Sequence, residues 1–343
     1  MRPMMQRSAV LLSVFTLALC GCGKGAKKPA TPSAPKANEP PANYVVAMVN
    51  STPLTWAEME KRASGYLKDD VDTNHLIIPT NRMEEAKEYF RRRSVNAFVF
   101  KTVMMDEAIK LNIRLSDSDR QEGLKSLANT LKLRNWTTND YFLKGPMPEA
   151  TMRAEFEDGL VIDKLLKLKV RDSIKIDSKE ITAAIETIGA TNDLKRAKLE
   201  AVRKQLLDGA NFEDVARTVS EDDSAKKGGD LGEFPRGKLV KSFEDAAFSQ
   251  KVGAVGPIVE TVMGYHIIKV IAHNPAQPAT ASTPALPETV HIAQILIKRI
   301  PVDRKRITES LLKTKYTAGV QKYFAELKAN SKIESNLYKD MTF

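Results

Sequence analysis

A glycine-rich stretch between Ser220 and His266 constrains the fold of this chain more than any other feature of the sequence. Two adjacent glycines and an aspartate, Gly228–Asp230, are typical of a tight turn, because glycine readily adopts positive φ and aspartate hydrogen-bonds to its own backbone. The residues that follow predict a short amphipathic helix over 241–248 and a buried strand over 262–271. The stretch therefore predicts a compact unit of loop, helix and strand, which by itself requires no chemistry.

Length and charge set the broad class of the protein. With 343 residues the chain is long enough for two or three domains of the usual ~100 to 200 residues. Its 53 lysine and arginine residues outnumber 43 acidic ones, and the net charge of +10 suits anionic surfaces or acidic clients. The positive charge is scattered and not interleaved with aromatic side chains, which argues against nucleic-acid binding. The histidines have no cysteine or acidic partners at ligand spacing, so we expect no metal site and no cofactor.

The amino-terminal segment has the features of an export signal. Residues 1–22 combine a basic start with an apolar run of 11 residues, Ala9–Leu19, which is shorter than the ~20 residues that span a bilayer. Gly21 before Cys22 resembles the lipobox of bacterial lipoproteins, whereas Cys20 fits that pattern poorly. We therefore expect acylation of Cys22, attachment to a bacterial membrane, and a folded part in the periplasm or otherwise outside the cytoplasmic membrane. A plain secretory signal is the alternative.

The residues after the signal predict a tether and a mostly helical domain. Residues 23–43 contain five prolines, a composition typical of an extended, semi-rigid linker. A short apolar strand, Tyr44–Asn50, follows, and Thr55 with Glu58 three residues later predicts a capped helix start. Apolar residues recur at helical spacing further along the chain, and such stripes usually belong to the core. We predict a helical amino-terminal domain over 44–172.

Two groups of motifs resemble known families. The central part of the chain closely resembles a parvulin-type (PpiC, rotamase) domain through the run L-x-x-G-A-N-F-E-D-V-A-R-T-V-S-E-D-D-S-A-K-K-G-G-D-L-G-E-F and the later blocks F-E-D-A-A-F and G-Y-H-I-I-K-V. The earlier segment V-A-M-V-N-x-x-P-L-T resembles exported foldase-chaperones of the SurA-like and PrsA-like kind, with Ser51 where that motif usually has glycine. The resemblance implies an α+β protein: a mostly helical chaperone-like domain and a parvulin domain with a four-stranded antiparallel sheet and helices.

The parvulin region over 173–273 lacks the strand with which this family normally opens. Its first part, Ile181–Leu199, offers only helical sequence with a glycine turn. Residues 288–298, which follow a proline-rich linker over 274–287, resemble the missing strand. We therefore predict a circularly permuted domain, in which the strand that opens the family's fold comes last in the sequence of the domain. The same strand could open a second parvulin domain, but the 45 residues after it are too few and contain no second glycine block. Residues 299–343 are expected to form a helix and a strand that pack on the amino-terminal domain.

The resemblance also implies an activity and a site. Parvulins catalyse rotation about X-Pro peptide bonds, whose barrier is ~18 to 20 kcal/mol, without a metal, a cofactor or a covalent intermediate. The expected clients are unfolded or partly folded exported polypeptides. Leu239 and Gln294 replace a methionine and a histidine that are common in the family. Matched by motif position, the catalytic residues are Asp222, His266 and Gln294, and the residues that bind the substrate are Leu239, Phe243, Met263 and Thr261.

Each of these residues also has an interpretation without chemistry. His266 can be a hydrogen-bonded structural histidine, and Asp222 the end of a solvated helix. Leu239 and Phe243 can be ordinary core residues. For the whole chain, the alternative is a holdase chaperone that binds unfolded exported clients and whose parvulin domain is inactive. An assay of proline isomerisation distinguishes the two functions.

Overall fold

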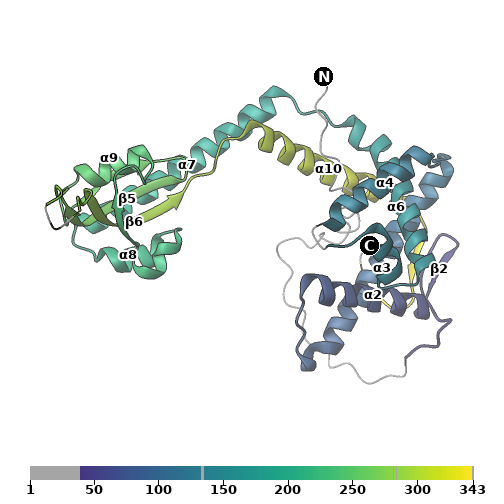
Figure 1. Cartoon of the computed structure of the whole chain (residues 1–343). Helices are drawn as coiled ribbons and strands as arrows, with labels where there is room; N and C mark the ends of the chain where they lie inside the picture. Colours follow the sequence, from purple (N-terminus) through teal and green to yellow (C-terminus); the bar gives the residue numbers. More distant parts are fainter. Residues whose placement is uncertain (1–38, 133–134, 281, 283, 342–343) are drawn as a thin grey trace. The chain divides into compact units, whose positions relative to one another are not determined.

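The chain forms two compact units in the computed structural model, which describes residues 39–132, 135–280, 282 and 284–341 (Figure 1). The first unit contains the described residues up to 175 together with those from 312 onward, and the second contains residues 176–311. The predicted export signal, Cys22 and most of the predicted tether lie outside the described residues. Within the described part of the chain, no helix is long and apolar enough to cross a membrane.

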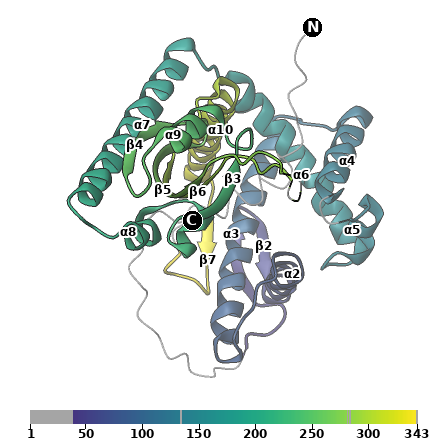
Figure 2. The same ribbon diagram turned by 60° about the vertical axis from the view of Figure 1, so that its left-hand side comes forward.

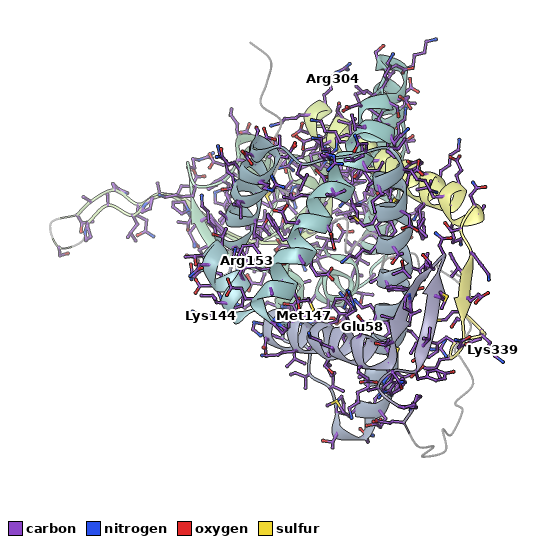
Figure 3. All side chains as sticks on the ribbon, turned by 90° about the vertical axis from the view of Figure 1, so that its right-hand side faces the viewer. Glu58, Lys144, Met147, Arg153, Arg304 and Lys339 are labelled. Carbon is purple, nitrogen blue, oxygen red and sulfur yellow. The ribbon has the colours of Figure 1, made fainter. Side chains whose placement is uncertain are left out.

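The first unit is mostly helical, as predicted. α2 begins at the predicted cap, where the Thr55 hydroxyl accepts from the Glu58 amide and the Glu58 carboxylate accepts from the Thr55 amide. Met147 lies in the turn between α5 and α6 (Figure 3). Its side chain lies against Gly65 of α2. The described helices of this unit are α2 (Trp56–Asn74), α3 (Met83–Lys110), α4 (Asp117–Leu131), α5 (Thr138–Lys144), α6 (Glu149–Lys169), the 3-10 turns η1 (Thr80–Arg82) and η3 (Arg171–Ser173), and the part of α10 (Arg304–Ala329) from residue 312 on.

A small antiparallel sheet pairs residues 45–49 with residues that lie almost 300 positions later in the sequence. β1 (Val45–Val49) pairs with β2 (Thr52–Thr55) on one side and with β7 (Ile333–Ser335) on the other. Tyr338, which follows β7, is buried in the same core cluster as β1, and Phe324 of α10 packs against that cluster. Residues 324–338 therefore contribute to the core of the first unit.

The second unit is built on a four-stranded antiparallel sheet with the strand order β3-β6-β5-β4. β6 lies between β3 and β5, although it is the last of these four strands in the sequence, and the four strands lie side by side in Figure 2. The predicted permuted strand therefore occupies an inner position of the sheet. The elements are α7 (Ser178–Leu207), α8 (Phe212–Val219), the 3-10 turn η4 (Asp223–Lys227), β3 (Asp230–Pro235), α9 (Lys241–Ser249), β4 (Val255–Glu260), β5 (Gly264–Asn274) and β6 (Thr289–Lys298).

Both faces of this sheet are covered by helices (Figure 1). Side chains alternate between the two faces of a strand, so odd-numbered residues such as Ile267 and Ile295 pack against α7 and α8. Even-numbered residues such as Ile268 and Ile292 pack against α9. The alternation also assigns His266 and Gln294 to the face that α9 covers.

The structure corrects two local predictions in this unit and adds a pairing within the linker. The glycine turn expected at Gly189 is absent from the described chain, because α7 continues through this residue; one glycine costs a helix only about 1 kcal/mol. The strand predicted to begin at Val262 begins at Gly264, after a turn closed by the Thr261 amide on the Gly264 carbonyl. The proline-rich linker is also partly paired, since Gln277 and Leu286 bridge as β5 turns back into β6.

Candidate active site

His266, on β5, is held by hydrogen bonds on both ring nitrogens. Its Nδ1 lies 2.8 Å from Gln294 Oε1 on the neighbouring strand β6, and its Nε2 lies 2.7 Å from Thr261 Oγ1 in the β4–β5 turn. The three residues are 3%, 6% and 8% exposed. Ile268 faces Gln294 in the sheet register, so His266 and Gln294 are diagonal neighbours on one face. Two residues that are 28 positions apart in the sequence thus form one buried polar pair.

The loop before η4 brings Asp222 to this pair. The loop is fastened to β6, because Leu296 donates its amide to Ser220 Oγ at 3.1 Å and accepts from the Glu221 amide at 2.8 Å. The Asp222 carboxylate accepts hydrogen bonds from the hydroxyl and the amide of Ser224, and the neighbouring side chain of Gln294 helps to lower the pKa of this carboxyl group. Hydrogen bonds link Gln294, His266 and Thr261, and Asp222 lies at the Gln294 end of this chain; we call these four residues the polar relay.

Gly229 allows this loop to approach β6 closely. Its φ is +86°, and its carbonyl accepts from the Gln294 amide at 2.9 Å. A Cβ at this position would overlap the Gln294 carbonyl oxygen. Gly229 is thus required by the close approach of β6, the strand that follows the proline-rich linker.

An apolar side chain contacts the relay at His266. Phe243, on α9, meets the His266 ring edge to face, with ring centroids 5.2 Å apart and an interplanar angle of 82°. Leu239 and Leu231 are partly buried against the same cluster as Phe243, and we call these three residues the apolar cup. Met263 lies apart from this cluster in the β4–β5 turn and is 54% exposed, while its amide donates to Thr261 Oγ1 at 3.1 Å.

Sequence reasoning missed two residues of the site. Ser224 is buried and makes two hydrogen bonds to Asp222, but a serine in a charged run gives no signal of its own. Leu231 belongs to the glycine block, where the only available signal was its apolar side chain between polar neighbours. Within the described residues, no cluster of three histidine, cysteine or acidic side chains is placed to hold a metal ion.

The environment shifts the pKa of both titratable groups of the relay. Burial lowers the pKa of His266 below its ordinary value of 6.5 and outweighs the hydrogen bond to Gln294 and the charge of Asp222, which raise it. Burial alone would raise the pKa of Asp222. The hydrogen bonds from Ser224 and Gln294 and the positive charge of Lys298 outweigh that effect, so this pKa lies below its ordinary 3.8. Near neutral pH the site therefore contains a neutral imidazole and a carboxylate.

The lowered pKa of His266 predicts a pH dependence of stability. Below pH 6.5 the unfolded chain takes up a proton that the folded chain does not, so the free energy of unfolding falls as pH decreases toward the folded-state pKa, by at most about 1.4 kcal/mol per pH unit. Urea unfolding of wild type and His266→Gln at several pH values measures this contribution, since the other histidines are common to both proteins. A stability difference that stays constant with pH would contradict the prediction.

Comparison with known proteins decides the family. Residues 161–274 match a family model described as the PPIC-type PPIASE domain. Peptidyl-prolyl cis-trans isomerase Pin1 of Arabidopsis thaliana is 48% identical over 80 residues, which are 23% of this chain and 67% of that protein. The chain belongs to the PPIC-type, or parvulin, family of peptidyl-prolyl isomerases. Its enzyme class is therefore peptidyl-prolyl cis-trans isomerase.

Two further relatives of this parvulin match over a longer part of the chain. Foldase protein PrsA of Caldanaerobacter subterraneus subsp. tengcongensis is 27% identical over 240 residues, which are 66% of this chain and 72% of that protein. Chaperone SurA of Burkholderia lata is 25% identical over 283 residues, 75% of this chain and 61% of that protein. The family-model match ends at residue 274, the last residue of β5, and thus excludes β6.

Proposed function

We propose that this parvulin isomerises X-Pro bonds in unfolded or partly folded exported polypeptides, and that the apolar cup and the polar relay carry the activity. The observation that supports this most is the meeting of the two at one point, where Phe243 contacts the His266 ring within a buried network that ends at Asp222. Thr261 holds His266 from the other side, and Met263 borders the site at the turn.

The chemistry needs only a surface that prefers a twisted amide. A planar X-Pro amide is dipolar, because resonance places negative charge on its oxygen and positive charge on its nitrogen, and rotation out of the plane removes this charge separation. An apolar surface offers the planar form no compensating hydrogen bonds, so it stabilises the twisted form relatively more. The side chains of Phe243 and Leu239 supply such a surface for the proline ring.

The carboxylate of Asp222 adds an electrostatic contribution in this proposal. A negative charge beside the substrate amide disfavours the negative charge that resonance places on the carbonyl oxygen, and it thereby lowers the barrier to rotation. Gln294 and Ser224 keep the carboxylate ionised and in place. No proton transfer and no bond cleavage are required.

Replacing Asp222 by asparagine tests this role. We expect kcat/KM on short X-Pro peptides to fall about 10- to 100-fold, the equivalent of a hydrogen bond to a charged group worth about 1.5–3 kcal/mol. A protease-coupled isomerisation assay measures the rate, and Asp223→Asn is the matched control, because Asp223 is the exposed neighbour. Equal rates for the two variants would remove Asp222 from the mechanism. A wild-type rate equal to the uncatalysed one would remove the isomerase activity itself.

We further propose that the protein is exported and attached to a membrane through an acylated Cys22. The lipobox-like Gly21–Cys22 pair and the proline-rich residues that follow support this proposal. Cell fractionation tests it. Wild type is expected in the membrane fraction and Cys22→Ser in the soluble fraction, with Cys20→Ser as the control. Membrane attachment that survives Cys22→Ser would contradict it.

A further inference from the structure

The hydrogen bonds of the polar relay run in one direction, because the side-chain amide of Gln294 has a donor end, its NH₂ group, and an acceptor end, Oε1. Ionised Asp222 only accepts hydrogen bonds, so Gln294 must turn its NH₂ group toward that carboxylate. Its carbonyl oxygen, Oε1, then faces His266 Nδ1 at 2.8 Å. An amide oxygen only accepts, so the proton of this contact belongs to His266 Nδ1.

The other side of His266 agrees with this assignment. When Nδ1 carries the proton of a neutral imidazole, Nε2 is an acceptor and takes the Thr261 hydroxyl proton across 2.7 Å. Thr261 Oγ1 in turn accepts from the Met263 amide at 3.1 Å. Each of these contacts then has one donor and one acceptor. An imidazolium would donate at Nε2 and compete with the Thr261 hydroxyl for the same contact.

We propose that Gln294 and Ser224 are positioning residues, which lock His266 as the neutral Nδ1–H tautomer by fixing the direction of the relay. Ser224 acts at the acidic end, where its hydroxyl and amide hold Asp222 as an ionised acceptor. Gln294 links the protonation state of Asp222 to that of His266. If its side-chain amide flipped, its oxygen would face the carboxylate, and two acceptors would then face each other.

The charged groups around the ring are consistent with a fixed protonation state. Asp222 is the charged residue that acts on His266, and Lys298 of β6 in turn acts on Asp222. The α9 side of the ring is covered by the uncharged Phe243, and the turn side by Thr261. The consequence for catalysis, which rests on the proposed function, is an isomerase rate that stays constant between pH about 6 and 8, where an ordinary histidine titrates.

Nitrogen-15 NMR of the full-length protein labelled at histidine tests the tautomer without reference to activity. His266, assigned by its loss in His266→Gln, is expected to show a protonated Nδ1 and an unprotonated Nε2 throughout pH about 6 to 8. An Nε2–H tautomer, or a ring that titrates in this range, would overturn the proposal even in an active enzyme. A locked tautomer in a protein without isomerase activity would leave the relay standing and refute only the proposed function.

Two sets of variants test the positioning residues separately. In Gln294→Glu, the carboxylate beside Nδ1 favours the imidazolium, so His266 is expected to titrate within pH about 6 to 8 and to make the rate pH-dependent there. Gln277→Glu, in the exposed linker, is the matched control and should leave the His266 titration and the pH dependence of the rate unchanged.

Ser224→Ala removes a hydrogen bond that favours the ionised form of Asp222, so the pH below which the isomerase rate falls is expected to rise. We call this pH the acid limit of the rate, and Ser224→Thr is expected to restore its wild-type value. An unchanged His266 spectrum in folded Gln294→Glu, or an acid limit that Ser224→Ala leaves in place, would contradict the assignment; if either variant fails to fold, the wild-type tautomer decides.

Discussion

Alanine at Gly229 is expected to lower the free energy of unfolding of the second unit by about 2–4 kcal/mol and kcat/KM by at least about tenfold. Two effects add at this position. Its φ of +86° costs a residue with a Cβ about 1–2 kcal/mol, and the new methyl group overlaps the Gln294 carbonyl oxygen, which forces the loop and β6 apart. Since the same loop presents Asp222 to Gln294, the displacement breaks the polar relay. Urea unfolding and the protease-coupled assay measure the two effects.

Gly232→Ala is the matched control for this prediction. Gly232 has a φ of +81°, close to that of Gly229, but a Cβ built there meets no atom within 4 Å. We expect only the backbone cost of about 1–2 kcal/mol and an unchanged isomerase rate. Equal losses of activity in the two variants would show that close packing against β6 is irrelevant to the site.

Alanine at Phe243 is expected to have the largest effect on activity among single substitutions in the apolar cup. The ring contacts His266 and, in the proposed function, supplies apolar surface for the substrate proline; burial of a side chain of this size is worth about 1.5–3 kcal/mol. If that energy is realised in the transition state, kcat/KM falls roughly 10- to 100-fold. The same change removes a buried aromatic residue, which typically costs about 3–5 kcal/mol of stability.

Phe248→Ala separates the two consequences. Phe248 lies on the same helix, belongs to the same core cluster and is 6% exposed against 5% for Phe243, but its ring faces His273 instead of His266. We expect a similar loss of stability with little loss of activity in the folded protein. A variant Phe248→Ala that is as inactive as Phe243→Ala would mean that activity follows the stability of α9 and not contact with the site.

The sequence predicted the parts of this fold that local chemistry determines. The cap at Thr55 and the turn at the adjacent glycines follow from residue types at fixed spacing, whereas the strand now seen as β6 was predicted from its resemblance to the opening strand of the parvulin family. The same resemblance predicted that Gln294 would lie beside His266, which the 2.8 Å contact shows. The roles of these residues in catalysis remain predictions.

The rest depended on tertiary contacts. β3 and β4 are the edge strands of the sheet and contain glycine, proline and acidic residues, which are poor strand formers, so their pairing with β6 and β5 determines their conformation. The continuation of α7 through Gly189 and the hydrogen bonds from Ser224 to Asp222 likewise depend on contacts for which the local residue pattern gives no signal. Residue pattern alone carries no signal for such features.

The most direct test of the central claim, an isomerase site shared by β5 and β6, is NMR exchange spectroscopy on a short X-Pro peptide with catalytic amounts of the protein. We expect cis-trans exchange far faster than the uncatalysed process of tens of seconds or longer. A saturating peptide is also expected to shift the side-chain resonances of both His266 and Gln294. Exchange at the uncatalysed rate in the presence of folded protein, or shifts confined to one of the two strands, would contradict a shared isomerase site.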